Sequence, residues 1–130
     1  MISYKQTGAI GIQRNHLSNA IAGLNQVEHA IQQGQSLLIS PEGTRSHNGK
    51  LQAFKKGPFH VAWHTQASIV PVMIRGAYES KNRGSFLIRA NHIQMTVEPV
   101  MDEQDFAHCQ SADDLRHLLH QYFSQRLAED

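Results

Sequence analysis

Cysteine is almost absent from this sequence, because Cys109 is its only representative in 130 residues. An intrachain disulfide needs two cysteines, and a cysteine-based metal site needs several. Both are therefore excluded for a single copy of the chain. A protein with so little cysteine suits a reducing compartment, so the sequence favours a cytoplasmic location.

Long apolar runs and clustered charge are also lacking. No run approaches the roughly 18 residues of a membrane span, and the first residues, MISYKQTGAIGIQR, lack the basic start and apolar centre of a signal peptide. The net charge is +1 with scattered basic residues, which argues against a nucleic-acid partner. We expect a soluble protein, or one in peripheral contact with the inner face of the cell membrane.

The composition is that of a folded protein. Hydrophobic residues make up 40% of the chain and charged residues 18%, which leaves enough apolar material for a core and too little charge for a disordered chain. A length of 130 residues suits one hydrophobic core. We therefore expect a single domain over residues 1–130.

Apolar periodicity and turn signals predict three helices. Apolar residues recur at three- and four-residue spacing from His16 until Gly34, where a helix would stop. A second helix is predicted over residues 58–66, because proline is well placed in a first turn. A third begins at the capping box formed by Ser111 and Asp114.

Short β-branched and apolar runs predict strands between these helices. Pro71 lies inside one run and would have to occupy an edge, a strand end or a bulge. The predicted strands cover residues 7–14, 36–40, 69–74, 86–90 and 93–100. Strands that alternate with helices indicate an α/β fold with a mixed or mostly parallel sheet flanked by helices.

The most informative segment, PEGTRS at residues 41–46, directly follows the predicted strand at 36–40. Gly43 lets the backbone approach a ligand, Thr44 and Ser46 offer hydroxyl groups, and Arg45 presents a fork that suits two phosphate oxygens. Glu42 can orient the arginine or accept a hydrogen bond from a substrate hydroxyl. An ordinary polar turn with a surface glutamate and arginine is the alternative.

Two lysines follow at the predicted start of the second helix, in the sequence FKKGP at residues 54–58. Lys55 and Lys56 would lie where the helix macrodipole also favours an anion. A solvated pair of surface lysines is the simpler reading. Taken with residues 41–46, they predict an anion-binding rim.

PEGTRS, followed by FKKG and then IVPV, resembles the glycerolipid acyltransferase family typified by 1-acylglycerol-3-phosphate acyltransferase, with this chain as its C-terminal portion. The resemblance implies that residues 42–45 contact the glycerol phosphate of the acceptor. It also implies that Arg14, at the end of a block similar to the family's second, faces the same phosphate. Residues 70–72 resemble a fourth block that shapes the wall of the acyl-chain site.

The resemblance implies a reaction and its partners. An acyl group would pass from acyl-CoA or acyl carrier protein to 1-acylglycerol-3-phosphate or a similar lysophospholipid acceptor, as a step of phospholipid biosynthesis. No metal and no other cofactor would take part. The implied substrate-binding residues are Arg14, Glu42, Gly43, Thr44, Arg45, Ser46 and Lys55.

The family's first block, a histidine with an aspartate five residues later, has no counterpart before Arg14. His16 is followed at that spacing by Ile21, and the His108–Asp113 pair lies after residues 41–46 instead of before them. We therefore expect a domain that is truncated on its N-terminal side, holds no catalytic residue and is inactive alone.

Two other interpretations stay open. The chain would then be a non-catalytic remnant that binds phospholipid head groups or a partner protein, or else an unrelated phosphate-binding protein. We also expect the chain to self-associate or else to remain partly molten, because a sheet without part of its cover leaves apolar residues and strand edges exposed.

Overall fold

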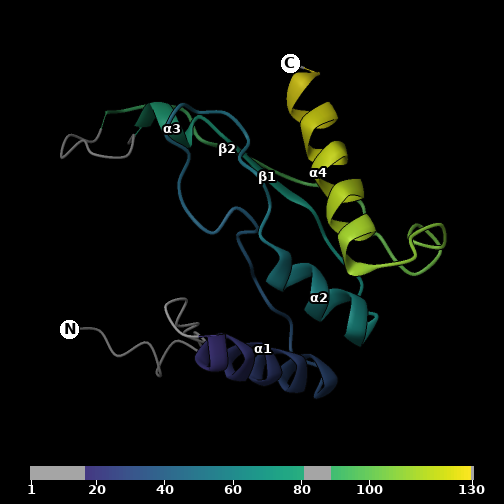
Figure 1. Cartoon of the computed structure of the whole chain (residues 1–130). Coiled ribbons are helices and arrows are strands. Elements are labelled where there is room, and N and C mark those ends of the chain that lie inside the picture. The colour runs from purple at the N-terminus through teal and green to yellow at the C-terminus, as the bar shows by residue number, and fades with distance from the viewer. Residues whose placement is uncertain (1–16, 81–88, 130) are drawn as a thin grey trace. The chain divides into compact units, whose positions relative to one another are not determined.

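A computed structural model describes residues 17–80 and 89–129 of the chain (Figure 1). It consists of two compact units, Met1–Ile39 and Ser40–Asp130, which are described separately.

The first unit is built around helix α1, Leu17–Gln32, which confirms the predicted helix. Val27 is buried. The helix ends at a turn in which the amide of Gly34 donates to the carbonyl of Ile31 and the amide of Gln35 donates to that of Ala30. Gly34 has a φ of +80°, a left-handed conformation that glycine adopts without the strain of a side chain.

The prediction of a strand at residues 36–40 is wrong. These residues form no strand, and Leu38 is 92% exposed. A strand needs a neighbour that pairs with its backbone groups, and the described part of the chain supplies none here. The apolar run in the sequence signals a preference for burial, but it does not identify the partner that would provide it.

The core of the second unit lies between helices α2, Lys56–Thr65, and α4, Ala112–Ala128. Phe54 stacks on Phe59 at a centroid distance of 5.7 Å and meets Phe123 edge-on at 5.6 Å. Leu115 and Leu119 of α4 are almost fully buried beside them. The predicted second helix is confirmed, although it begins two residues before Pro58.

Helix α4 begins with the predicted capping box. The Ser111 hydroxyl oxygen accepts from the amide of Asp114 at 3.1 Å, and the Asp114 carboxylate accepts from the amide of Gln110 at 3.0 Å. The hydrogen bond from the Gln110 amide to the carboxylate, followed by those from Ser111, holds the pKa of Asp114 below its usual range. Because a cap uses partners a few residues apart, it is specified locally.

Strands β1, Val72–Arg75, and β2, Gln94–Val97, pair antiparallel, with Val72 opposite Val97 and Arg75 opposite Gln94. The mixed or mostly parallel sheet is therefore not found among the described residues, which contain helices and a small antiparallel sheet. Antiparallel strands need no crossover helix, and the described part of the connection between β1 and β2 contains only the short helix α3, Ala77–Ser80.

The remaining strand predictions have mixed outcomes. Strands β1 and β2 fall within the predicted ranges 69–74 and 93–100 but for Arg75, and both are shorter than expected. Pro71 lies just before β1, at a strand end as expected, and its carbonyl accepts from the amide of Glu98. The range 7–14 and residues 86–88 lie outside the described residues, and residues 89–90 form no strand.

Within residues 17–80 and 89–129, no helix is both long enough and apolar enough to cross a membrane.

Candidate anion-binding site

The loop at residues 41–46 begins with a tight turn. The amide of Gly43 donates to the carbonyl of Ser40 at 3.1 Å, and Gly43 has a φ of +72°. The carboxylate of Glu42 accepts from the amide of Gln52 at 2.7 Å. Glu42 thus ties the start of the loop to the segment that returns toward α2.

A backbone hydrogen bond brings this loop to the N-terminus of α2. The amide of Lys55 donates to the carbonyl of Pro41 at 2.8 Å. Lys55 is also the N-cap residue of α2, and its side chain makes no capping hydrogen bond. The first amides of a helix lack intrahelical acceptors and carry the positive end of the macrodipole, so this position favours an anion.

Residues 46–50, which follow the turn, are held by hydrogen bonds among their own polar groups. The Ser46 hydroxyl donates to the carbonyl of Lys50 at 2.9 Å and accepts from the amide of Asn48. The Tyr78 hydroxyl donates to the carbonyl of His47 at 3.1 Å. Ser46 therefore has a structural role within the loop, which the sequence analysis did not foresee.

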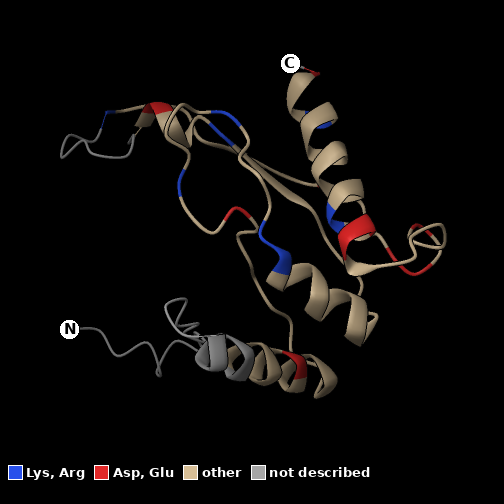
Figure 2. Cartoon of the chain, in the orientation of Figure 1, with Lys and Arg blue, Asp and Glu red and all other residues tan. Residues whose placement is uncertain are grey.

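Two cationic side chains of this region differ from the other polar groups in having no described partner. Arg45 and Lys55 are exposed, and within the described ranges no hydrogen bond or ion pair engages either side-chain charge. Thr44 is also exposed. Figure 2 shows basic residues at the start of α2. Arg14, the other predicted phosphate ligand, lies outside the described residues.

The carboxylate of Asp113, at the start of α4, interacts with three basic side chains. It accepts from the Arg116 guanidinium at 2.9 Å, and it lies 3.9 Å from Lys56 and 3.5 Å from His117. The hydrogen bond from Arg116 holds the pKa of Asp113 below its usual range. Across the described parts of the chain, no hydrogen bond or ion pair joins His108 to Asp113.

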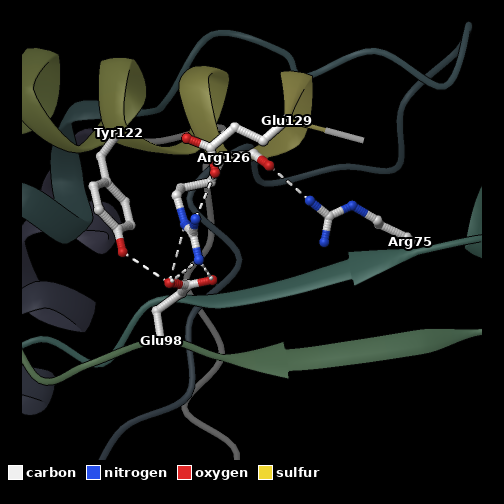
Figure 3. A network of polar contacts seen from close by, with 5 residues as sticks. All are labelled: Arg75, Glu98, Tyr122, Arg126 and Glu129. Carbon is white, nitrogen blue, oxygen red and sulfur yellow. Dashed lines mark hydrogen bonds and ion pairs between the residues drawn. The ribbon is translucent and has the colours of Figure 1, made fainter.

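A polar network that the sequence analysis missed connects α4 to the sheet (Figure 3). Glu98 is only 6% exposed and accepts from the Tyr122 hydroxyl at 2.9 Å and from the Arg126 guanidinium at 3.0 Å. The Arg75 guanidinium donates to the backbone carbonyl of Arg126 at 2.7 Å. These bonds fix the C-terminal half of α4 against the end of β2.

The network changes the acidity of its members. The hydrogen bond from Tyr122, together with Arg126, holds the pKa of Glu98 below its usual range. Burial and the bond to Glu98 raise the pKa of Tyr122. Spacing gave a partial signal, because Tyr122 and Arg126 are four residues apart on one helix face, but Glu98 is distant in sequence.

A cavity of about 310 Å³ lies elsewhere in the second unit. Its walls include Trp63 of α2, Leu115 of α4, and Phe106 and Cys109 of the segment before α4. Burial raises the pKa of the Cys109 thiol. None of the residues at 41–46 lines this cavity.

The sequence and fold are similar to those of known acyltransferases. The acyltransferase family profile matches residues 2–75. A 1-acyl-sn-glycerol-3-phosphate acyltransferase of Limnanthes douglasii is 30% identical over 119 residues, which cover 91% of this chain and 42% of that protein. The human 1-acyl-sn-glycerol-3-phosphate acyltransferase alpha is 38% identical over 68 residues, 52% of this chain and 24% of that protein.

A solved structure shares the fold. The 1-acyl-sn-glycerophosphate (LPA) acyltransferase PlsC from Thermotoga maritima superposes with a TM-score of 0.69 at 22% identity, over 85% of this chain and 46% of that one. The chain therefore belongs to the acyltransferase family, and it spans less than half the length of these relatives.

Proposed function

We propose that this chain is the acceptor-binding part of a phospholipid-biosynthesis acyltransferase, and that residues 42–46 and Lys55 form the site for the glycerol phosphate of a 1-acylglycerol-3-phosphate-like acceptor, with Arg45 and Lys55 as ligands of the phosphate. Similar proteins are named for that acceptor. Arg14 is proposed as a further phosphate ligand on the family resemblance alone. The acyl donor is proposed to be acyl-CoA or acyl carrier protein.

The observation that carries this proposal is that, within residues 17–80 and 89–129, no hydrogen bond or ion pair engages the side-chain charge of Arg45 or Lys55. Lys55 is the N-cap residue of α2 and makes no side-chain cap, and its amide joins the helix start to Pro41 of the loop that carries Arg45. A phosphate would accept from the arginine fork, from the lysine and from the helix amides at once. Glu42 already accepts from the amide of Gln52, so its role is to hold the loop in shape for that contact.

The chain alone is proposed to lack transferase activity, because the loop supplies cations and hydroxyl groups but no general base. General base catalysis typically contributes about 10²- to 10⁴-fold, and loss of the positioning around a base removes more. His108 is no substitute, since the Asp113 carboxylate that would orient it binds Arg116 instead. We expect no acyl transfer above background from the purified chain, whereas robust transfer that disappears in His108→Ala would overturn this part.

Calorimetric titration with glycerol 3-phosphate tests the binding site. Charge-assisted hydrogen bonds contribute about 1.5 to 3 kcal/mol, so Arg45→Ala should weaken binding by roughly ten-fold or more. Lys50→Ala is the matched control. It removes an exposed cation from the same part of the chain, and the Lys50 side chain is not proposed to bind phosphate. Equal affinity in wild type and Arg45→Ala would remove Arg45 from the site.

A further inference from the structure

The glycine that follows β1 determines where helix α3 begins. Gly76 has a φ of +78°, and the side-chain amide of Asn91 donates to its carbonyl at 2.9 Å. A Cβ at this position would overlap the backbone carbonyl of His92, so a residue with a side chain does not fit unless the backbone shifts. The chain therefore passes within one residue from β1 into α3, which carries Tyr78.

Tyr78 contacts the segment that follows Arg45. Its hydroxyl donates to the carbonyl of His47 at 3.1 Å, across 31 positions of the sequence. Its ring lies against Gly49, where a Cβ would be 3.0 Å from the ring atom Cδ1 and 3.3 Å from Cγ. Gly49 also has a φ of +75°, which residues with a side chain rarely adopt. The hydroxyl and the ring of Tyr78 thus contact the same turn at two points.

The turn that Tyr78 contacts begins one residue after Arg45. The Ser46 hydroxyl donates to the carbonyl of Lys50 at 2.9 Å, and the amide of Lys50 donates to the side-chain oxygen of Asn48 at 3.1 Å. Within residues 17–80 and 89–129, no hydrogen bond or ion pair holds the charged end of Arg45. The backbone of this segment therefore sets where the Arg45 guanidinium lies.

We propose that Tyr78 is a positioning residue of the anion-binding site, which holds the turn at residues 46–50 and so presents Arg45 to the phosphate. This role rests on the proposed function, and it adds to the site a residue from outside the loop and outside α2. Tyr78 acts through Arg45 and not by contact with the phosphate. A loop that is fixed before binding loses less conformational freedom when the ligand arrives, so loss of the anchor should weaken binding.

Calorimetric titration of the whole chain with glycerol 3-phosphate tests this role in a graded series. Tyr78→Ala removes both contacts and should weaken binding by about three- to ten-fold. Tyr78→Phe keeps the ring against Gly49 but removes the hydroxyl, so its affinity should lie between the other two, with a melting temperature close to that of the wild type. Ile74→Ala is the matched control, because it truncates an exposed apolar side chain of the preceding strand and should bind like the wild type.

Gly49→Ala tests the same contact from the side of the loop. The added methyl group would displace the Tyr78 ring, so the affinity for glycerol 3-phosphate should fall. Gly34→Ala is its control, because Gly34 has a similar φ of +80° but no atom within 4 Å of the place that a Cβ would take. It should carry the same backbone strain and keep the affinity of the wild type.

The possible results separate this role from the proposed function. Equal affinity in the wild type and Tyr78→Ala would overturn the positioning role and leave the phosphate site in place. An equal loss in Ile74→Ala would show that affinity follows general stability, which also overturns it. A wild type that binds no glycerol 3-phosphate would overturn the proposed function and this role with it. Near-ultraviolet circular dichroism verifies folding, and Tyr78→Phe with Gly49→Ala decides if Tyr78→Ala is not native.

Discussion

Arg126 and Arg45 show two different uses of the same side chain. The Arg126 guanidinium binds the buried Glu98, and the backbone carbonyl of Arg126 accepts a hydrogen bond from the Arg75 guanidinium. Arg45 is an exposed residue of the loop at residues 41–46, and no carboxylate of the described residues forms an ion pair with its guanidinium. A charge with internal partners stabilises the fold, whereas a charge without them is available to an external anion.

The difference also separates the parts of the chain that set stability from those proposed to bind substrate. The aromatic core, the α4 cap and the Glu98 network fix helices α2 and α4. The loop at residues 41–46 is held by backbone bonds and by Glu42, which leaves the Arg45 side chain exposed. Variants of the two regions should therefore change different measured quantities.

The largest change in stability should come from the core. Leu115 is 1% exposed, and Leu115→Ala removes buried methyl groups and leaves a cavity, at a cost of about 2 to 5 kcal/mol in the free energy of unfolding. Leu38→Ala is the control, because Leu38 is almost fully exposed and its loss should change stability by about 0.5 kcal/mol or less. Urea unfolding measures both, and similar values for the two variants would contradict the packing described for α2 and α4.

A smaller loss of stability should follow from Glu98→Gln, which removes the charge that Arg126 and Tyr122 bind. We expect the melting temperature to fall by several degrees, while the affinity for glycerol 3-phosphate stays within about two-fold of the wild type. Arg45→Ala should show the reverse pattern. A fall in phosphate affinity in Glu98→Gln equal to that in Arg45→Ala would remove the separation between the two regions.

The same variant has an expected pH dependence. The folded-state pKa of Glu98 lies below its ordinary value near 4.5, so its contribution to stability is complete above that value and is lost as the pH falls toward the folded-state pKa. Urea midpoints of the wild type should therefore fall on acidification below about pH 4.5 more steeply than those of Glu98→Gln. Parallel curves would show that Glu98 has the same pKa in both states.

The smallest of these effects should come from Lys55→Ala, which removes a point charge but no bidentate fork. We expect a few-fold loss of glycerol 3-phosphate affinity, less than that of Arg45→Ala, and little change in melting temperature because the ammonium has no partner in the described regions. Lys50→Ala again serves as the control. A larger loss from Lys55→Ala than from Arg45→Ala would make the helix terminus, and not the arginine, the main contact.

Features that depend on neighbours in sequence were predictable here. Helix α1, the Gly34 stop and the Ser111–Asp114 cap follow from spacing and from local hydrogen bonds. Family motifs pointed to residues 41–46 and Lys55, and the structure joins them through the bond between Lys55 and Pro41. Whether these residues bind phosphate stays a prediction.

Features that depend on distant partners were not predictable. Glu98 meets Tyr122 and Arg126 from 24 and 28 residues away, and no periodicity encodes that contact. The apolar run at residues 36–40 predicted a buried strand, but burial requires a neighbour that the run itself does not specify. The direction of strand pairing also depends on distant partners: β1 and β2 pair antiparallel, and the expected mixed or mostly parallel sheet is not confirmed by the described residues.

The central claim is that the loop at residues 41–46 and the start of α2 bind a phosphate, and amide NMR spectra during titration with glycerol 3-phosphate test it most directly. The account predicts saturable shifts of the amides of Gly43, Thr44 and Arg45 and of the first turn of α2, with the amides around Glu98 and Arg126 unchanged. The same shifts should be much reduced in Arg45→Ala. Shifts confined to the region of Glu98 and Arg126, or no saturable shift at any amide, would contradict it.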